Sequence, residues 1–524
     1  MTSHTGQVST VLVDGRVIDH PTAGSRGIGR YTVSLVGALR AASVDVTVLV
    51  DDPRQGEAWS NAVPGVVVER LAPRVFREAS PDTWFLCTQL MLHPIPLDVI
   101  PSAVTRSGLR VMAVMYDVIP QRWPERYLVD GAALQMSRLR TMLARTVDHF
   151  VAISTFTADT ASVELGVPRG RFTVIGSAVD AKFAPGEKRG SGDGTVVANT
   201  GPDDRKNTEA LIRAWSSIPA RSRAGHHLDI VCGVPDDVRR RWNSLVASLG
   251  LDDVRVRGAV SDHELVTTYR SCSLAVFPSL EEGFGLPVAE AAACGAPVVC
   301  SDTSSMPEVV TSRDAVFDPY DVGDMARVIE RALVDSGYRA RLFEVSRACA
   351  RRWTWERVGE DAARAFTDSG PTSPDRRPIM RPKVAVVGRP DPLIPDAWPH
   401  DSEVVVVYDV SNTDLRAGAN VVWGWGRFSH GHDFDAVVTR LGDDRQSGTD
   451  AMMGAEPGHL WLADGVSVPA YAGRAVSVIV ESASAATEVT RVVGDHVPVH
   501  VLGAADSRGR VAEVARLVLE GVGS

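Results

Sequence analysis

The sequence predicts an α/β protein in which Rossmann-like, doubly wound units follow one another along the chain. Three observations support this prediction: strand and helix periods alternate, glycine-rich loops follow some strands, and polar or proline-rich stretches separate the alternating regions. With 524 residues, 44% of them apolar and 23% charged, the chain has the composition of a globular protein and not of a disordered one. A chain of this length holds about two to four domains.

The first alternating region predicts a domain over residues 1–182. It contains the glycine-rich loop Gly24–Gly29, followed by a helix with Tyr31, Leu35 and Leu39 on one face. The loop allows three interpretations: a dinucleotide cofactor site, a plain tight turn, or closure over a phosphate in a cleft between domains. The order strand, helix, strand predicts a parallel sheet. Its expected strands lie at 9–14, 45–52, 109–119, 148–154 and 171–180.

A second alternating region predicts another doubly wound domain over residues 183–367. A polar, glycine-rich stretch at 184–194 precedes it and reads as a hinge. A helix at 353–366, with tryptophans near its start, closes it, and the prolines of 368–382 predict a linker because they prevent regular packing. The expected strands lie at 195–201, 228–233, 254–260, 273–279 and 296–301.

Residues 383–524 predict a third, degenerate Rossmann-like domain that is not catalytic. Its strand periods are intact, but the loop after its first strand, 389–396, carries prolines where a phosphate loop would carry glycines. Residues 379–524 also hold a net charge of about −7 of the chain's −10, which disfavours a diphosphate. We expect this domain to serve docking or stability and to support a homo-oligomer.

The segment 281-EEGFGLPVAEAAACGAPVV-299 is the strongest indication of a ligand site. Gly283 and Gly285 allow a tight turn before a helix, and free backbone N–H groups at a helix N-terminus bind anions. Because phosphate repels carboxylate, Glu282 and Glu290 should face hydroxyl groups of the same ligand. A phosphate cradle beside two hydroxyl acceptors indicates a nucleotide-sugar site. The alternative is a solvated acid with a favourable helix-dipole pairing.

Two adjacent cations, Arg205 and Lys206, lie in 200-TGPDDRKN-207 at the carboxyl end of an expected strand. Ligands of open α/β sheets bind at that edge, where these cations would neutralise a diphosphate leaving group. The alternative is a solvated basic pair. The stretch 304-SSMPEV-309 begins either an ordinary helix or a second helix that faces the ligand.

Together these stretches resemble glycosyltransferase family 4, whose members are retaining enzymes of the GT-B architecture. The resemblance covers about residues 8–367 and includes GIGRY, DVIPQRWPERY, VAISTFTADTASVELGVP, TGPDDRKN, the E-x7-E block and the closing WTWERV helix. It implies two Rossmann-like domains facing a cleft, with the acceptor on the first and the nucleotide sugar mainly on the second. It also implies that the closing helix crosses back onto the first domain.

The resemblance implies a role for each matched residue. Glu290 would hold the ribose hydroxyls, Glu282 a hydroxyl of the transferred sugar, and Arg205 and Lys206 the diphosphate. The expected catalytic set is Glu282, Arg205, Lys206 and Asp117. The expected donor-binding set is Gly27, Gly29, Tyr116, Ser154, Gly201, Gly283, Phe284, Gly285, Leu286 and Glu290.

One departure from the family pattern concerns 116-YD-117, where many relatives carry His-Asp. Tyr116 can donate and accept a hydrogen bond but carries no positive charge near neutral pH. Asp117 matches the pattern and is expected to contact the acceptor or the donor sugar. Its alternative role is to cap the loop that follows.

The expected function is retaining transfer of a hexosyl unit from a nucleotide sugar, GDP-mannose or a related GDP-deoxyhexose, to a lipid-linked saccharide in cell-surface glycan synthesis. Front-face transfer is expected, with the diphosphate charge stabilised by cations and backbone amides. The alternative is a catalytically silent nucleotide-sugar-binding scaffold. No D-x-D motif lies at a suitable strand end, so neither metal nor cofactor is expected.

The composition of the chain indicates which classes of partner and which cellular compartment to expect. Outside the acidic last segment the charge is nearly balanced, which disfavours a nucleic-acid partner. Six scattered cysteines without a C-x-x-C pair indicate reduced thiols in the cytoplasm. No signal peptide or spanning run is recognisable, so membrane contact should be peripheral, on the inner face of the membrane.

Overall fold

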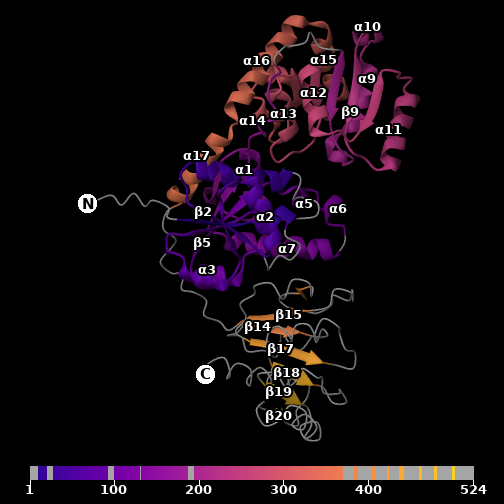
Figure 1. Cartoon of the computed structure of the whole chain (residues 1–524). Coiled ribbons are helices and arrows are strands. Elements are labelled where there is room, and N and C mark those ends of the chain that lie inside the picture. The colour runs from indigo at the N-terminus through magenta and orange to yellow at the C-terminus, as the bar shows by residue number, and fades with distance from the viewer. Residues whose placement is uncertain are drawn as a thin grey trace.

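A computed structural model describes residues 10–19, 27–92, 99–129, 131–186 and 194–369, together with seven short strands between 383 and 501. Figure 1 shows two α/β domains joined end to end, each built on a parallel sheet with helices packed against it. The predicted pair of Rossmann-like sheets is therefore confirmed. None of the helices in these ranges is long and apolar enough to cross a lipid bilayer.

The first domain is built on a seven-stranded parallel sheet with the order β3-β2-β1-β4-β5-β6-β7. The crossover lies beside β1, where Val11 pairs with Val46 on one side and with Trp84 on the other. Its strands are β1 (Val11–Asp14), β2 (Val46–Val50), β3 (Val67–Arg70), β4 (Trp84–Cys87), β5 (Arg110–Met115), β6 (His149–Ala152) and β7 (Phe172–Val174).

The first helix of this domain buries one apolar face. In α1, Tyr31, Leu35 and Leu39 are buried at the predicted spacing of four residues. The helices are α1 (Gly27–Ala41), α2 (Pro53–Ala62), α3 (Pro73–Glu78), α4 (Ser102–Ser107), α5 (Ile119–Arg122), α6 (Pro124–Tyr127), α7 (Gly131–Thr146) and α8 (Thr155–Leu165), with 3-10 turns η1 (Arg16–Asp19) and η3 (Arg169–Arg171).

Two predicted strands of this domain are shorter in the structure: the strand at 171–180 ends at Val174 as β7, and the strand at 109–119 also ends early. β5 ends at Met115, and Ile119 already begins α5. The side chain of Asp117 accepts a hydrogen bond from the backbone N–H of Ile119 at 3.1 Å, which turns the chain into the helix. The apolar residues that follow Asp117 therefore belong to this turn and not to the strand.

The second domain is built on a six-stranded parallel sheet with the order β10-β9-β8-β11-β12-β13. Its central residues Val196, Val197 and Ala198 are fully buried, as expected for a strand covered on both faces. The strands are β8 (Thr195–Asn199), β9 (His227–Val231), β10 (Val254–Gly258), β11 (Leu274–Phe277), β12 (Val298–Ser301) and β13 (Val316–Phe317).

Most helices of the second domain follow a strand. The helices are α9 (Thr208–Ser217), α10 (Ala220–Arg223), α11 (Asp236–Ser248), α12 (Asp262–Ser271), α13 (Leu286–Ala293), α14 (Met306–Val309), α15 (Val322–Val334), α16 (Ser336–Arg352) and α17 (Trp355–Asp368), with 3-10 turns η4 (Asp204–Lys206) and η5 (Arg313–Ala315). Of these, α10, α16 and α17 follow another helix.

The last of these helices, α17, returns to the first domain and packs against α1 (Figure 1). Gly359 makes this close approach possible, because a Cβ atom there would lie 2.4 Å from the carbonyl oxygen of Ala38. At its far end the ring of Phe366 packs edge-on against Trp84, with ring centroids 5.8 Å apart. The chain therefore crosses between the two domains twice.

Seven further strands pair in parallel in the order β16-β15-β14-β17-β18-β19-β20. The loop at 389–396, the linker at 370–382 and the connections expected in a third domain lie outside the described residues. The strands are β14 (Lys383–Val387), β15 (Glu403–Val407), β16 (Val422–Trp423), β17 (Ala436–Leu441), β18 (His459–Leu462), β19 (Ser477–Val480) and β20 (Val499–Val501).

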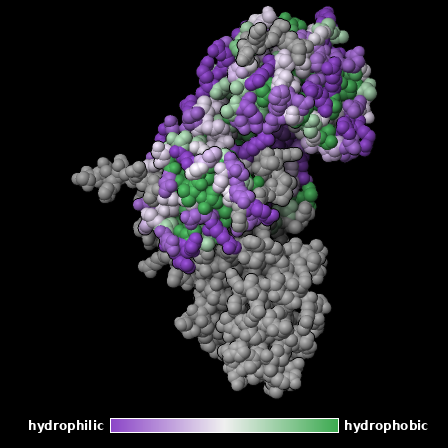
Figure 2. All heavy atoms as spheres, viewed as in Figure 1, coloured by the Kyte–Doolittle hydropathy of each residue, from purple (hydrophilic) through white to green (hydrophobic). Residues whose placement is uncertain are grey.

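A notch separates the two α/β domains on the face shown in Figure 2, and its visible wall is hydrophilic.

The loop after β5 of the first domain contacts the loop after β11 of the second, since a Cβ atom on Gly283 would lie 2.2 Å from the carbonyl oxygen of Tyr116. The two strand-end loops predicted to bind a ligand therefore face one another.

Candidate active site

Glu282 lies in the loop after β11 and pairs with both predicted cations. Its carboxylate lies 3.1 Å from Arg205 Nη1 and 2.5 Å from Lys206 Nζ. Burial opposes ionisation of Glu282, but the charges of Lys206 and Arg205 outweigh it and lower its pKa to about 2. Glu282 is therefore ionised across the physiological pH range.

The two cations are largely enclosed, which excludes the alternative of a solvated basic pair. The side chain of Arg205 is 19% exposed and that of Lys206 16%. Both project from η4, which is capped by Asp203, whose carboxylate accepts the N–H of Arg205 at 3.0 Å. The charges of Arg205 and Lys206 are matched by two carboxylates, Glu282 and Asp203, the second of which lies 3.5 Å from Arg205 Nε.

The glycine loop between β11 and α13 is held against the first domain. The carbonyl oxygen of Gly283 accepts hydrogen bonds from Ser154 Oγ at 2.6 Å and Thr157 Oγ1 at 2.9 Å. Ser154 is 1% exposed and also caps α8, where it accepts the N–H of Thr157. Ser154 was expected to bind the donor. In this structure its hydroxyl group is engaged by the glycine loop and by the cap of α8.

The other residues of the loop set its shape. Gly285 precedes α13 with a φ of +97°, a left-handed conformation that favours glycine. Phe284 is buried, and its ring packs edge-on against Trp353 at a centroid distance of 5.0 Å. Gly201 lies beside the stem of Lys206, since a Cβ there would be 3.4 Å from its Cγ.

Glu290 opens onto a second part of the cleft. This pocket lies between α1 and α13, and its walls include Gly27, Arg30, Leu286 and Trp355. Burial, followed by the nearby Asp262 carboxylate, raises the pKa of Glu290 to about 7, although Arg30 and Lys182 partly oppose the change. Among the described residues no hydrogen-bond donor contacts the Glu290 carboxylate, so it is available to hydroxyl groups of a ligand.

The predicted glycine-rich loop of the first domain contributes to the same pocket. Gly27 begins α1 and is exposed, and a Cβ there would meet nothing within 4 Å. Gly29 is buried within the first turn. The stretch 24–26 lies outside the described residues, so its geometry does not separate the three interpretations.

Tyr116 and Asp117 lie at the end of β5 with different orientations. The Tyr116 hydroxyl lies 3.2 Å from Thr32 Oγ1, and its ring packs edge-on against Tyr31 at 5.4 Å. Burial raises the pKa of Tyr116 above its usual range. The Tyr116 side chain therefore packs against α1, and its carbonyl oxygen lies against the glycine loop.

Asp117 fills its alternative expected role, since it caps the loop that follows. One carboxylate oxygen caps the loop by accepting the N–H of Ile119, and the other has no hydrogen-bond partner among the described residues. Burial raises the pKa of Asp117, partly opposed by that hydrogen bond and by the charge of Arg205. Asp117 therefore offers one free acceptor at the cleft.

Several polar residues at this interface had no role assigned from the sequence. The buried Glu281 accepts a hydrogen bond from Trp123 Nε1 at 2.7 Å and pairs with Arg122 Nε at 2.8 Å. Glu308 accepts the N–H groups of Thr155 and Phe156 at 2.8 and 2.7 Å, so it caps α8 from the other domain. The stretch 304–309 thus holds the domains together. The sequence signal that could have indicated this role of Glu308 is a carboxylate that follows a proline in the first turn of a helix.

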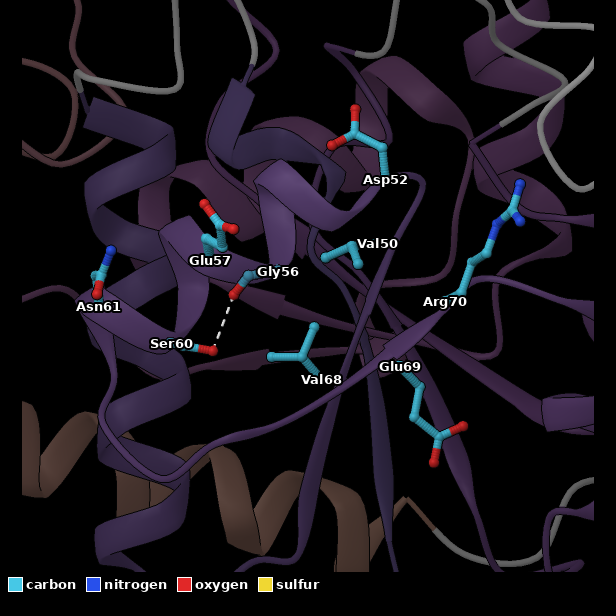
Figure 3. Close-up of a pocket in the computed structure, with 9 residues that line it drawn as sticks. All are labelled: Val50, Asp52, Gly56, Glu57, Ser60, Asn61, Val68, Glu69 and Arg70. Carbon is cyan, nitrogen blue, oxygen red and sulfur yellow. Dashed lines mark hydrogen bonds between the residues drawn. The ribbon is translucent and has the colours of Figure 1, made fainter.

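A larger cavity, of about 610 Å³, lies apart from these residues, between α2 and β3. Figure 3 shows its polar side chains, two of which are hydrogen-bonded to the backbone of α2. Asp52 caps α2 by accepting the N–H groups of Arg54 and Gln55, and Ser60 Oγ bonds the carbonyl oxygen of Gly56. The acidic end of β2, compatible with a dinucleotide site, is thus engaged in a helix cap.

Two family models match the two α/β domains separately. The model described as "Glycosyltransferase Family 4" matches residues 25–183, and the model "Glycosyl transferases group 1" matches residues 195–348. The matched regions contain the residues that line the cleft on both sides.

Relatives with assigned activities match part of the chain. The serotype-specific mannosyltransferase WbdA of Escherichia coli is 32% identical over 286 residues, which cover 52% of this chain and 34% of that protein. The O-antigen chain mannosyltransferase B of Escherichia coli is 34% identical over 166 residues, covering 31% of this chain and 43% of that protein. The chain therefore spans about a third of the length of the first relative and less than half of the second.

A solved structure shares the arrangement of the two domains. The HepE protein of Anabaena, solved in complex with UDP and glucose, superposes with a TM-score of 0.54 at 16% identity. The superposition covers 69% of this chain and all of that one. At this identity the likeness shows the fold alone, two Rossmann-like domains in the GT-B arrangement.

Proposed function

Since this chain belongs to the group 1 glycosyltransferases of family 4, we propose that it is a retaining enzyme that moves a hexosyl unit from a nucleotide sugar to a saccharide acceptor. The observation that carries the proposal is the enclosed group of Arg205, Lys206 and Glu282, with Glu290 at the other side of the glycine loop. It offers cations for a diphosphate and carboxylates for hydroxyl groups in one cleft.

The charges of the residues suggest how a donor binds. Arg205 and Lys206 take the diphosphate through charge-assisted hydrogen bonds. Glu282 accepts a hydroxyl group of the transferred sugar. Glu290, with no competing donor, accepts the ribose hydroxyls, while Gly283, Gly285 and the α13 N-terminus approach the phosphates.

Stabilisation of the leaving group makes the largest contribution to the rate of the transfer step. The bond between the anomeric carbon and the diphosphate oxygen breaks, and its electron pair leaves with the nucleoside diphosphate. Arg205 and Lys206 offset the growing charge. The acceptor hydroxyl oxygen forms the new bond on the same face, and its proton passes to a phosphate oxygen. Asp117 contacts the acceptor or the transferred sugar.

For the donor we propose GDP-mannose or a related GDP-deoxyhexose, and for the acceptor a lipid-linked saccharide at the cytoplasmic face of a membrane. The mannosyltransferases named above support this choice of sugar. Calorimetric titration with GDP, UDP and ADP tests the base. The proposal requires one of them to bind, and tightest binding by GDP supports the named donor. Binding of none would remove the proposed function.

For residues 383–524 we propose a degenerate Rossmann-like domain that binds no nucleotide and serves docking or oligomer formation. The parallel pairing of β14 to β20 and the net charge of about −7 support this proposal. Truncation near Ser373 tests it. A truncated chain that folds and binds donor normally is expected. A folded one that fails to bind donor would make this region part of the active site.

A further inference from the structure

A short part of the first domain reaches across the cleft to the residues that hold Arg205. It consists of Arg122, Trp123 and Tyr127, at the ends of α5 and α6, and we call these three residues the clasp. Trp123 and Arg122 both bind the Glu281 carboxylate, at 2.7 and 2.8 Å. The Tyr127 hydroxyl donates to Asp203 Oδ2 at 2.6 Å.

Both partners of the clasp in turn hold the Arg205 guanidinium. The carbonyl oxygen of Glu281 accepts a hydrogen bond from Arg205 Nη1 at 2.8 Å. The carboxylate of Asp203 lies 3.5 Å from Arg205 Nε and also accepts its backbone N–H. Glu281 and Asp203 therefore each contact the first domain through their side chains, and each also contacts Arg205. The orientation of Arg205 depends on groups from both domains.

The burial of Glu281 indicates that this contact is more than a surface ion pair. Glu281 is 3% exposed, and a carboxylate at such a site is costly unless it is paired. Its Oε2 accepts the hydrogen bond from Trp123, whereas Oε1 accepts no hydrogen bond and is compensated by the ion pair with Arg122. The ion pair of Arg126 with Asp204 and those of Asp262 with Arg30 and Lys182 also join the two domains, but their side chains are more exposed and they contribute little by comparison. None of these ion pairs includes Arg205.

We propose that Glu281 and Asp203 are positioning residues, through which the clasp sets Arg205 for the diphosphate of the donor when the two domains are apposed. This inference rests on the proposed function and adds to it that full diphosphate affinity requires contacts from the first domain. Recognition of the nucleoside and its first phosphate does not depend on them.

The test compares nucleoside diphosphate with the monophosphate of the same base, GDP with GMP and UDP with UMP, by calorimetry on the full chain. Tyr127→Phe removes one hydroxyl from the clasp, and Glu281→Gln removes its buried charge. Tyr320→Phe and Glu344→Gln are matched controls, because both side chains are exposed, at 66% and 62%, and within the described part of the chain neither contacts Arg205 or lines the Glu290 pocket. Thermal unfolding checks that each variant is folded.

We expect Tyr127→Phe to weaken diphosphate binding about tenfold, with monophosphate binding changed less than about twofold, because the lost hydrogen bond involves a charged group. Glu281→Gln should have the same selective effect, and the controls none. In an Arg205→Lys background, Tyr127→Phe should have less than about a twofold effect, since the guanidinium it acts through is gone.

Three outcomes separate the inference from the proposed function. If wild type binds none of GDP, UDP and ADP, the proposed function fails and the inference with it. If wild type binds but Tyr127→Phe weakens both phosphates equally, the clasp has only a structural role. An unchanged effect of Tyr127→Phe in the Arg205→Lys background would also overturn the inference. Tyr127→Phe decides the matter even if Glu281→Gln does not fold.

Discussion

Replacing Glu290 by glutamine should make the free protein more stable at alkaline pH while it weakens donor binding. The carboxyl group has a folded-state pKa of about 7 against an ordinary value of 4.5. Because the folded pKa is the higher one, its contribution to stability is complete below about pH 4.5 and is lost as the pH rises through about 7. The full pKa difference corresponds to about 3 kcal/mol of unfolding free energy.

Solvent at this half-buried side chain reduces the expected effect to about 2 kcal/mol. Glutamine keeps the shape without the charge, so Glu290→Gln should match wild type near pH 4.5 and exceed it by that amount at pH 8. Urea unfolding of both proteins at the two pH values measures the difference, with Glu344→Gln as the control for an exposed carboxylate. Equal stability of Glu290→Gln and wild type at pH 8 would refute the pKa argument.

Three other substitutions test separate parts of the site. Glu282→Gln should raise the affinity for nucleoside diphosphate in calorimetry, because the net charge around it rises, yet lower transfer at least about 100-fold, since a sugar contact is lost; weaker diphosphate binding would contradict the charge argument. Ser154→Ala should cost about 1–2 kcal/mol in urea unfolding, as it removes a helix cap and a bond to Gly283, and an unchanged midpoint would count against that role. Gly359→Ala should cost about 1–3 kcal/mol by crowding the Ala38 carbonyl oxygen, which thermal unfolding would show; no loss would mean that α17 can shift freely.

The two-sheet architecture was predictable because its signals are local. Runs such as Val196–Ala198 are apolar on both faces, as a buried parallel strand requires, and the spacing of Tyr31, Leu35 and Leu39 marks the buried face of α1. The strand predicted at 109–119 was too long because an apolar run does not show where Asp117 turns the chain.

The site was predictable in its residue types and not in its contacts. The glycine spacing indicated where the chain turns at Gly285, but the pairing of Glu282 with Lys206 joins residues 76 positions apart. Glu281 meets Trp123 across 158 positions and across two domains, so its role depends on how the domains are apposed. The orientation of Tyr116 depends likewise on α1, which the neighbouring sequence does not specify.

Product analysis tests the central claim most directly. Wild type and Glu282→Ala are incubated with GDP-mannose, a GDP-deoxyhexose and UDP-hexoses in the presence of a cell lipid extract, and mass spectrometry and NMR follow the products. The account predicts that wild type adds one hexosyl unit, with the anomeric configuration of the donor retained, and that Glu282→Ala does not. Binding of nucleoside diphosphate without transfer from any of these donors would contradict it and favour a nucleotide-sugar-binding scaffold.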